Sequence, residues 1–362
     1  MQSFTCAFIG LGLIGGSIAK AIRAHHPNSI IYASDIDVSS LNLAKQEGII
    51  NDTITSYEDG KLKECDYLFL CAPVLENDKL ILNIKDHIGS KTILTDVGSV
   101  KQGIHKRINE LGLTHCFIGG HPMAGSEKTG YAFSNERLIE NAYYILTPTE
   151  DVPKEKVNSF QEFVTSLGAI AMLLTPSDHD YVTAAVSHIP HLISAELVNL
   201  VKKHDLPDET MKMIAAGGFK DITRISSSSP TMWKQITFMN DKHILGLLDS
   251  YIESLELLRK QIIENEEDKV LNMFSDAKDY RETFSDLSSG PIRMVYRTYV
   301  NIPDEAGIIG KIASLLASYD ISLKNIGIIH NREFEEGVLR IEFYDKPSLL
   351  LAKKILSENG YD

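Results

Sequence analysis

The chain has 362 residues, of which 43% are hydrophobic and 23% charged, and its formal net charge is −13. Because a single core stops growing at about 250–300 residues, two or three domains are expected. An excess of 49 acidic over 36 basic side chains, with no basic cluster, argues against a nucleic-acid-binding or membrane-surface protein. An anionic ligand would therefore need a local positive pocket.

The four cysteines form no CxxC pair and lie mostly in apolar segments, which is typical of free thiols in a reducing compartment. Residues 4–19 carry no charge, but no basic segment precedes them, so a signal peptide is not expected. No other stretch reads as long and apolar enough to span a bilayer. These features predict a soluble, cytoplasmic protein.

Up to about residue 175, short β-rich segments alternate with helical patterns, from TCAFIG (5–10) to AIAMLL (169–174). Strands of continuous apolar residues separated by helices predict a parallel, doubly wound sheet. Residues 176–288 read as a helical domain, with long helices over 179–204 and 231–284. Pro190 should kink or break the first of these helices.

The segment SDLSSGP (285–291) reads as a linker. Residues 294–362 then follow a β-α-β-β-α order, which lacks only a final strand to complete a ferredoxin-like βαββαβ unit. The missing strand means either that the chain is truncated or that the sheet edge is completed in another way.

A glycine-rich turn, GLGLIGG (10–16), directly follows the first predicted strand and gives the G-x-G-x-x-G fingerprint of a Rossmann-type dinucleotide site. Asp35, at the end of the second strand, would accept hydrogen bonds from a ribose diol and favours NAD over NADP, and Asp37 could share this role. The alternative is a glycine turn that binds nothing. The candidate cofactor-binding residues are Gly10, Gly12, Leu13, Ile14, Gly15, Asp35, Ala72, Pro73 and Ser99, although Ala72 and Pro73 are equally consistent with an ordinary loop.

Two later strands end in a hydroxyl and an imidazole, Ser99 in TDVGSVK (95–101) and His121 in GGHP (119–122). A neutral imidazole is a common base for taking a proton from an alcohol as hydride leaves. A capping serine and a loop histidine are the alternatives. Glu127 and Lys128 follow in the sequence. They belong either to the site or to a surface ion pair, and the sequence favours neither.

The helical domain supplies AVSHIPHLIS (185–194) and GGFKDITRISSSSPTMW (217–233). His188 and His191 share a helix face and favour substrate contacts over a core role or a metal site, since no further ligands stand at metal-binding spacing. Arg224 is suited to clamp a carboxylate, with a surface salt bridge as the alternative. Gly217 allows close backbone approach, and Trp233 belongs either to the pocket wall or to the core.

Together, GLGLIGGS, TDVGSVK, GGHPMAGSEKTG, VSHIPH and GGFKDITRI…SPTMW resemble, in this order, the prephenate dehydrogenase family of tyrosine biosynthesis over residues 4–285. Residues 295–362 resemble an ACT domain, a small regulatory module of amino-acid metabolism, with PDEAG (303–307) as its first turn. The resemblance implies three domains: an NAD-binding domain at 1–175, a helical substrate and dimerisation domain at 176–288, and an ACT domain at 294–362.

The resemblance further implies NAD-dependent oxidative decarboxylation of prephenate to 4-hydroxyphenylpyruvate. His121 and Ser99 would act on the ring hydroxyl, and Arg224 with His191 and His188 would hold the carboxylates. Glu127 and Lys128 would form a gate, and no metal is implied. An ACT effector, most plausibly L-tyrosine, would bind near Asp304, Gly307 and Asn325; a purely dimerising ACT domain is the alternative.

Other readings stay open at this point. Arogenate could replace prephenate, or both could be substrates, as in a cyclohexadienyl dehydrogenase. A non-catalytic NAD and amino-acid sensor is an alternative of another class. A β-hydroxyacid dehydrogenase is a third, but it would need a catalytic lysine in the helical domain. Amphipathic helices at 179–204 and 231–268 favour a homodimer.

Overall fold

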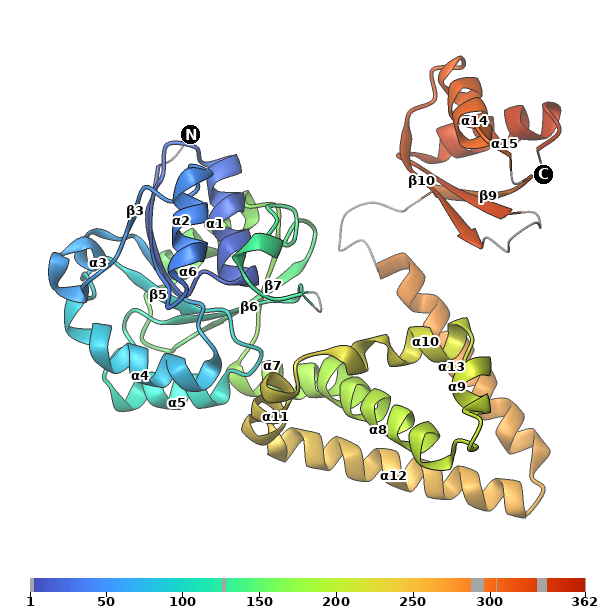
Figure 1. Cartoon of the computed structure of the whole chain (residues 1–362), viewed down its shortest axis with the longest axis horizontal. Coiled ribbons are helices and arrows are strands. Elements are labelled where there is room, and N and C mark those ends of the chain that lie inside the picture. Colours follow the sequence, from blue (N-terminus) through green and yellow to red (C-terminus); the bar gives the residue numbers. More distant parts are fainter. Residues whose placement is uncertain (1–2, 126–127, 288–295, 304, 331–336, 362) are drawn as a thin grey trace. The chain divides into compact units, whose positions relative to one another are not determined.

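The computed structural model describes residues 3–125, 128–287, 296–303, 305–330 and 337–361 (Figure 1). By its internal contacts the chain divides into two compact units, Met1–Glu264 and Asn265–Asp362. The first unit contains both the predicted Rossmann-type sheet and most of the helical region. Glu127 and Asp304, two of the residues singled out in the sequence, lie outside the described residues.

The first sheet has five parallel strands in the order β3-β2-β1-β4-β5. Helices cover both faces of the central strands β1 and β4, and the residues of these strands are accordingly buried and almost all apolar, with Thr5 at the start of β1 as the exception. The predicted parallel, doubly wound sheet is thereby confirmed for these five strands, which are β1 (Thr5–Ile9), β2 (Ile30–Ser34), β3 (Asp52–Thr53), β4 (Tyr67–Leu70) and β5 (Ile93–Asp96).

Helices pack on both faces of this sheet and form a separate apolar cluster on each (Figure 1). On one face lie α1 (Leu13–His25), α2 (Val38–Gln46) and α6 (Lys154–Ser166); on the other lie α3 (Lys61–Glu64), α4 (Val74–Ile84) and α5 (Gln102–Glu110). Short 3₁₀ turns stand at Tyr57–Asp59, Lys85–His87 and Tyr131–Phe133.

A second, three-stranded sheet has the order β6-β7-β8, formed by β6 (Ile118–Pro122), β7 (Tyr143–Pro148) and β8 (Ile170–Leu173). A parallel bridge between Leu94 and Phe117 places β6 beside β5 with the same direction. However, β7 runs antiparallel to β6, so the prediction of a wholly parallel sheet is wrong at this point. The reason is the connection: between β6 and β7 the described residues hold a 3₁₀ turn but no crossover helix, which a parallel return needs.

The helical region begins with α7 (Pro176–Thr183), a π-helical turn (Ala184–His188) and α8 (Ile189–His204). Pro190 stands in the first turn of α8, directly after the π turn, and the helical backbone continues through it; a change of helix type before Pro190 takes the place of the predicted kink or break. The remaining elements of the region are α9 (Thr210–Ile214), α10 (Gly217–Thr223), a 3₁₀ turn (Arg224–Ser227), α11 (Pro230–Met239) and α12 (Asp241–Ile263).

The segment Pro176–His204 is long and apolar enough to span a membrane by length and composition alone, with a mean hydropathy of 1.2 in its most apolar window. The expectation that no such stretch exists is therefore wrong by this criterion. The same segment nevertheless buries His179, Asp180 and His188, and all three side chains make hydrogen bonds to other elements of the first unit. The segment therefore contributes a buried cluster of polar side chains to the fold, in addition to its apolar residues.

In the second unit, α13 (Glu267–Leu287) precedes β9 (Tyr296–Ile302), α14 (Ile308–Ala317), β10 (Leu323–His330), β11 (Gly337–Phe343) and α15 (Lys346–Glu358). The strands form an antiparallel sheet in the order β10-β11-β9. Alternate residues of β9 and β11, such as Val300 and Leu339, are buried against α14 and α15. The β-α-β-β-α order is as predicted, whereas the start of the predicted linker, residues 285–287, belongs to α13.

Candidate functional site

The glycine turn after β1 is shaped by the end of β4. Gly10 has φ +97°, and a Cβ there would lie 2.8 Å from the backbone nitrogen of Ala72. A Cβ on Gly15 would lie 2.7 Å from the carbonyl oxygen of Gly10, whereas a Cβ on Gly12 would meet nothing within 4 Å. The first and third glycines thus allow close packing, and the second leaves open space at the N-terminus of α1, where Leu13 and Ile14 begin the helix. This arrangement fits a dinucleotide pyrophosphate.

Asp35, directly after β2, is tied to this turn. Its carboxylate accepts hydrogen bonds from the backbone N–H of Leu11 (2.5 Å) and of Asp37 (2.8 Å). The side chain of Asp37 instead caps α2, where hydrogen bonds from Ser39 and Ser40 lower its pKa. The two carboxylates therefore differ in role, and Asp35 is the one held beside the glycine turn.

The carboxylate of Asp96, at the end of β5, joins the two segments that carry Ser99 and His121. It accepts hydrogen bonds from the backbone N–H of Gly98 (2.9 Å) and Gly120 (3.2 Å). It also pairs with the ammonium group of Lys101, which is fully buried. Ser99 lies half-buried in the loop between Gly98 and Lys101.

His121, in β6, is buried and belongs to a chain of three hydrogen-bonded side chains. Its Nδ1 lies 2.8 Å from Nε2 of His179, and Nδ1 of His179 lies 2.8 Å from Oδ1 of Asp180. The backbone N–H groups of Lys101 and Gln102 donate to the two oxygens of Asp180, at 2.7 and 2.9 Å. The sheet and the helical region thus meet in one polar network.

Burial is the main cause that holds the pKa of His121 well below its usual value, and the nearby His179, Lys101 and His188 add to it. Burial also lowers the pKa of His188, to about 4, and of His179, although Asp180 opposes the shift at His179. These imidazoles are therefore neutral near pH 7. A neutral imidazole can accept a proton.

The glycines before His121 are required for packing against the protein itself. A Cβ on Gly119 would lie 2.3 Å from Oγ1 of Thr147, and one on Gly120 would lie 2.6 Å from the carbonyl oxygen of Asp96. Crowding within the sheet, at β5 and β7, accounts for both glycines. They let β6 approach its neighbouring strands closely, and His121 of β6 then lies within hydrogen-bond distance of His179 on α7.

A second cluster is formed by residues of the π-helical turn, α8 and α11. The rings of His191 and Trp233 stack with centroids 3.7 Å apart, and the ring of His188 meets Trp233 edge-on at 5.9 Å. The pKa of His191 is lowered by burial and, to a smaller extent, by the charge of Arg224. Among the described residues, the indole N–H of Trp233 is buried without an acceptor. Four of the predicted substrate residues are therefore neighbours.

The other predicted residues are less closely tied to this cluster. Gly217 begins α10 with open space around it, and Ala72 and Pro73 follow β4 beside Gly10. The ammonium group of Lys128 lies 5.0 Å from the ring centroid of Phe133.

Sequence reasoning missed His179, Asp180 and Asn240. The amide of Asn240 donates to the backbone oxygen of Asp180 (2.7 Å) and lies 3.1 Å from Nδ1 of His188. A signal was present in the sequence: SDHDY (177–181) places an imidazole and a carboxylate side by side at the start of the apolar helical segment Pro176–His204. Charged groups on the buried side of such a helix need partners.

Hydride transfer to a nicotinamide needs a nucleotide held beside a group that takes up a proton. The carboxyl edge of this sheet brings together an open glycine turn, with Asp35 beside it, and the buried, neutral imidazole of His121. The fold and the site thus define an NAD-dependent dehydrogenase.

The chain belongs to the prephenate dehydrogenase family. Residues 18–173 match the family model "Prephenate dehydrogenase, nucleotide-binding domain", and residues 175–276 match "Prephenate dehydrogenase, dimerization domain". The chain is 39% identical over 342 residues to a prephenate dehydrogenase of Bacillus subtilis, covering 94% of this chain and 92% of that protein. It is 33% identical over 358 residues to that of Lactococcus lactis, covering 97% and 96%.

Among solved structures, the prephenate dehydrogenase of A. aeolicus is similar with a TM-score of 0.73 and 29% identity, covering 78% of this chain and 99% of that one. That protein was crystallised with hydroxyphenyl propionate and NAD⁺.

The two carboxylates after β2 give a matched test of cofactor binding. In Asp35→Asn the amide no longer repels a 2′-phosphate and holds the ribose diol less well. We expect KM for NAD⁺ to rise roughly tenfold, a change of about 1.4 kcal/mol in binding, and the preference for NAD⁺ over NADP⁺ to fall. Steady-state kinetics with both cofactors measure this.

Asp37→Asn is the control, because Asp37 only caps α2. It should leave both KM values within about twofold, since Asn caps helices about as well as Asp. Equal effects of the two substitutions would contradict the assignment of Asp35.

Proposed function

We propose that the protein oxidises prephenate with NAD⁺ and releases 4-hydroxyphenylpyruvate and CO₂, as a step of tyrosine biosynthesis. The observation that carries this proposal is the buried, neutral imidazole of His121 at the same sheet edge as the glycine turn. The similarity of the chain, along most of its length, to the prephenate dehydrogenases of B. subtilis and L. lactis supports it. So does the aromatic acid held by the A. aeolicus protein.

In this proposal, Nε2 of His121 accepts the proton of the hydroxyl group on C4 of the substrate ring, and Ser99 orients that hydroxyl. When bound, NAD⁺ supplies the acceptor for the hydride that leaves C4. The oxidised ring carries a carboxylate at C1, and the loss of CO₂ from C1 makes the ring aromatic. The protein therefore needs no second base for decarboxylation.

Prephenate carries two carboxylates, which call for cationic or hydrogen-bonding groups. We assign one carboxylate to Arg224, with His191 and His188 at the pyruvyl side. The influence of Arg224 on the pKa of His191 supports their proximity. The buried N–H of Trp233 supports a role as a further donor in this part of the site. Glu127, Lys128 and Gly217 complete the proposed substrate site.

Two substitutions separate proton transfer from substrate binding. His121→Asn removes the base, so kcat should fall by roughly 10²–10⁴-fold with little change in KM. Arg224→Ala removes a carboxylate partner, so KM for prephenate should rise roughly tenfold or more while kcat changes less. Because the pKa of His121 is held below its ordinary value, wild-type kcat should decline only below about pH 6.5. NADH formation measures all three.

His115→Asn, an exposed histidine six positions before His121, and Arg137→Ala, an exposed arginine, are the matched controls and should behave like the wild type. An unchanged kcat in His121→Asn would refute the proposed base. Cofactor binding without turnover of prephenate would instead favour a sensor, and faster turnover of arogenate would change the assigned substrate.

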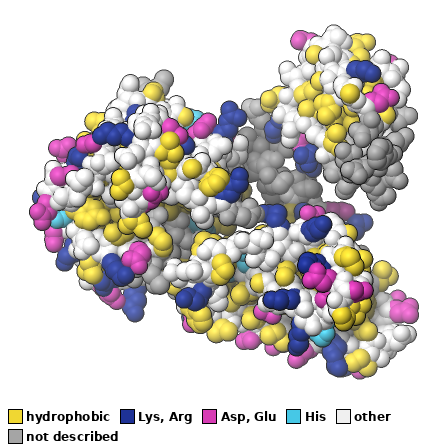
Figure 2. All heavy atoms as spheres, in the orientation of Figure 1, with side chains coloured by type: hydrophobic (Ala, Val, Ile, Leu, Met, Phe, Trp, Pro, Cys, Tyr) yellow, Lys and Arg dark blue, Asp and Glu magenta, His cyan; other side chains and the backbone are white. Residues whose placement is uncertain are grey.

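We further propose a homodimer formed by the helical region. The family model that covers residues 175–276 is described as a dimerization domain. Large apolar side chains are exposed on α12, among them Ile252, Leu255, Ile262 and Ile263. Figure 2 shows apolar side chains among charged ones on the surface of the helical region. Burying such side chains against a second copy is the simplest way to remove them from water.

Light scattering at micromolar concentration should give twice the mass of one chain. Leu255→Glu, which places a charge in the proposed interface, should lower the measured mass, and Lys260→Glu, on the same helix, should not. A wild-type protein with the mass of a single chain would contradict the dimer.

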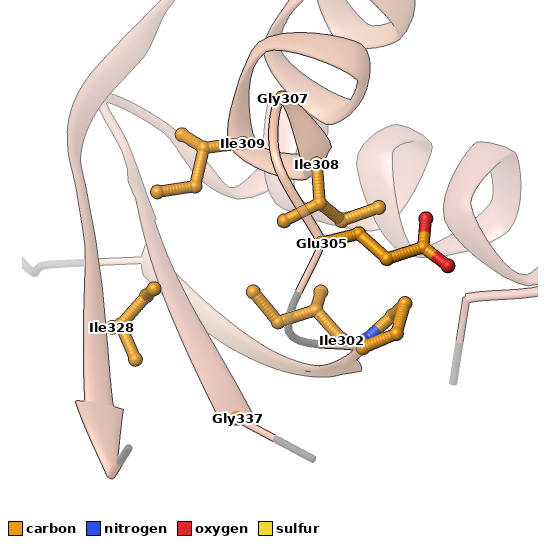
Figure 3. Close-up of a pocket in the computed structure, with 8 residues that line it drawn as sticks. Ile302, Glu305, Gly307, Ile308, Ile309, Ile328 and Gly337 are labelled. Carbon is orange, nitrogen blue, oxygen red and sulfur yellow. The ribbon is translucent and has the colours of Figure 1, made fainter. Parts of the chain in front are cut away.

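We also propose that residues 294–362 form an ACT regulatory domain that binds L-tyrosine. A shallow pocket that is open to solvent lies at the N-terminus of α14 (Figure 3). Ile302, Ile308, Ile309 and Ile328 give it an apolar wall. The carboxylate of Glu305 and the first N–H groups of α14, after Gly307, suit the ammonium and carboxylate groups of an amino acid. Gly307 lines the pocket, whereas Asn325 does not.

L-Tyrosine should inhibit the wild-type enzyme. Ile309→Glu puts a charge in the pocket and should weaken this inhibition at least tenfold while leaving basal kcat unchanged. Leu350→Glu, an exposed position on α15 outside the pocket, is the control. Inhibition curves measure the effect, and a wild-type enzyme insensitive to tyrosine would leave dimerisation as the role of this domain.

The domain boundaries and the location of the protein complete the proposal. We divide the chain at 1–175, 176–288 and 294–362, which agrees with the change of family model between residues 173 and 175. The contact-based division at residue 264 differs, since it groups α13 with the second unit. We assign the protein to the cytoplasm, which its four free cysteines support.

A further inference from the structure

Asp180 anchors a chain of hydrogen bonds that ends at His121. Its two oxygens accept the backbone N–H groups of Lys101 and Gln102, at the N-terminus of α5. A helix N-terminus stabilises a negative charge. Burial acts to raise the pKa of Asp180, but hydrogen bonds from His179, Gln102 and Lys101 outweigh it, and the net pKa is lowered. Asp180 is therefore a carboxylate, which can only accept hydrogen bonds.

This charge fixes which nitrogen of each imidazole carries its proton. Because Asp180 only accepts, Nδ1 of His179 must be the donor in their hydrogen bond. A neutral His179 then has its lone pair on Nε2, and Nε2 faces Nδ1 of His121. Nδ1 of His121 must therefore carry the proton, which leaves the lone pair of His121 on Nε2.

The groups around these three hydrogen-bonded side chains keep both imidazoles neutral, with the protons on the nitrogens just described. Lys101, paired with Asp96, lies on one side and disfavours a proton on His179 and on His121. His188, held by the amide of Asn240, lies on the helical side and disfavours a proton on His121 as well. A protonated His179 would donate hydrogen bonds from both nitrogens. Nδ1 of His121 would then have to accept, and the proton of a neutral His121 would lie on Nε2, which could then not take up the substrate proton.

We infer that His179 and Asp180 are positioning residues that hold His121 as its Nδ1–H tautomer, so that Nε2 is the atom that takes the substrate proton. This inference rests on the proposed function and assigns two residues to it. In the step, the O–H bond of the substrate hydroxyl breaks, its electron pair stays on oxygen, and the proton becomes bonded to Nε2. The resulting imidazolium keeps Nδ1–H directed at His179, whose other nitrogen is hydrogen-bonded to the Asp180 anion.

Two substitutions of His179 test the chain through kinetics. His179→Leu removes the acceptor for Nδ1–H of His121, so kcat should fall roughly 10- to 100-fold, less than for loss of the base itself, with KM for prephenate and NAD⁺ little changed. His179→Gln can place an amide oxygen near the former Nε2 and should recover much of kcat. The control is His105→Leu. His105 is a largely buried histidine on α5 that is hydrogen-bonded to Thr147 and takes no part in the His121–His179–Asp180 series.

A second measurement does not depend on turnover. In the full-length protein labelled with ¹⁵N-histidine, the ring nitrogen shifts of His121, assigned by their loss in His121→Asn, report which nitrogen carries the proton. We expect the Nδ1–H tautomer in the wild type and a shift toward Nε2–H in His179→Leu. An Nε2–H tautomer in the wild type, or a kcat of His179→Leu within threefold of the His105→Leu control, would overturn the inference. Absence of prephenate turnover in the wild type, with the Nδ1–H tautomer intact, would refute the proposed function alone.

Discussion

The site depends on one carboxylate placed on the end of one helix. Asp180 comes from α7, and the N–H groups that hold it come from the start of α5, 78 and 79 residues earlier in the chain. This contact holds α7 against the start of α5, and it thereby fixes the position at which His179 forms its hydrogen bond with His121. The carboxylate is buried, so its charge must be met by hydrogen bonds, and the free N–H groups of the helix end supply them without a full positive charge.

A second buried carboxylate, Asp96, does the corresponding work within the sheet. It holds Gly98 and Gly120, and its charge is met by the ammonium group of Lys101. Lys101 therefore links both anions, through its side chain to Asp96 and through its backbone to Asp180. The cation prevents a net build-up of negative charge around the imidazoles, which would otherwise favour their protonation. A buried ion pair of this kind is weak evidence for stability, but here it keeps a base neutral.

Much of the cofactor side could be predicted from the sequence because the signals there are local. Gly10, Gly12 and Gly15 stand next to each other in the chain, and Asp35 follows at the end of the next strand. His121 could be singled out by its place at the end of a predicted strand, between two glycines and a proline. His179 could not be matched to it, because 58 residues separate the two and only packing brings α7 to β6. The reversal of β7 was missed for a similar reason, since the pattern of an apolar strand carries no direction.

The difference between Asp35 and Asp37 illustrates the same limit. Both carboxylates were reasonable ribose partners, and the helix that Asp37 caps was not anticipated in detail. Trp233 was equally open between pocket and core, and the structure shows features of both, because its ring stacks on His191 while its N–H lacks an acceptor among the described residues.

The π-helical turn at Ala184–His188 sets the direction of His188 relative to His179. Along a regular α-helix each residue turns by about 100°, so His179 and His188, nine residues apart, would point to opposite sides. The wider turn changes this rotation, and His188 lies close enough to His179 for a proton on His179 to lower the pKa of His188. A single-residue deletion here would leave the composition almost untouched and yet rotate one histidine away from the other. In this segment the number of residues between the two histidines is constrained as strongly as their identity.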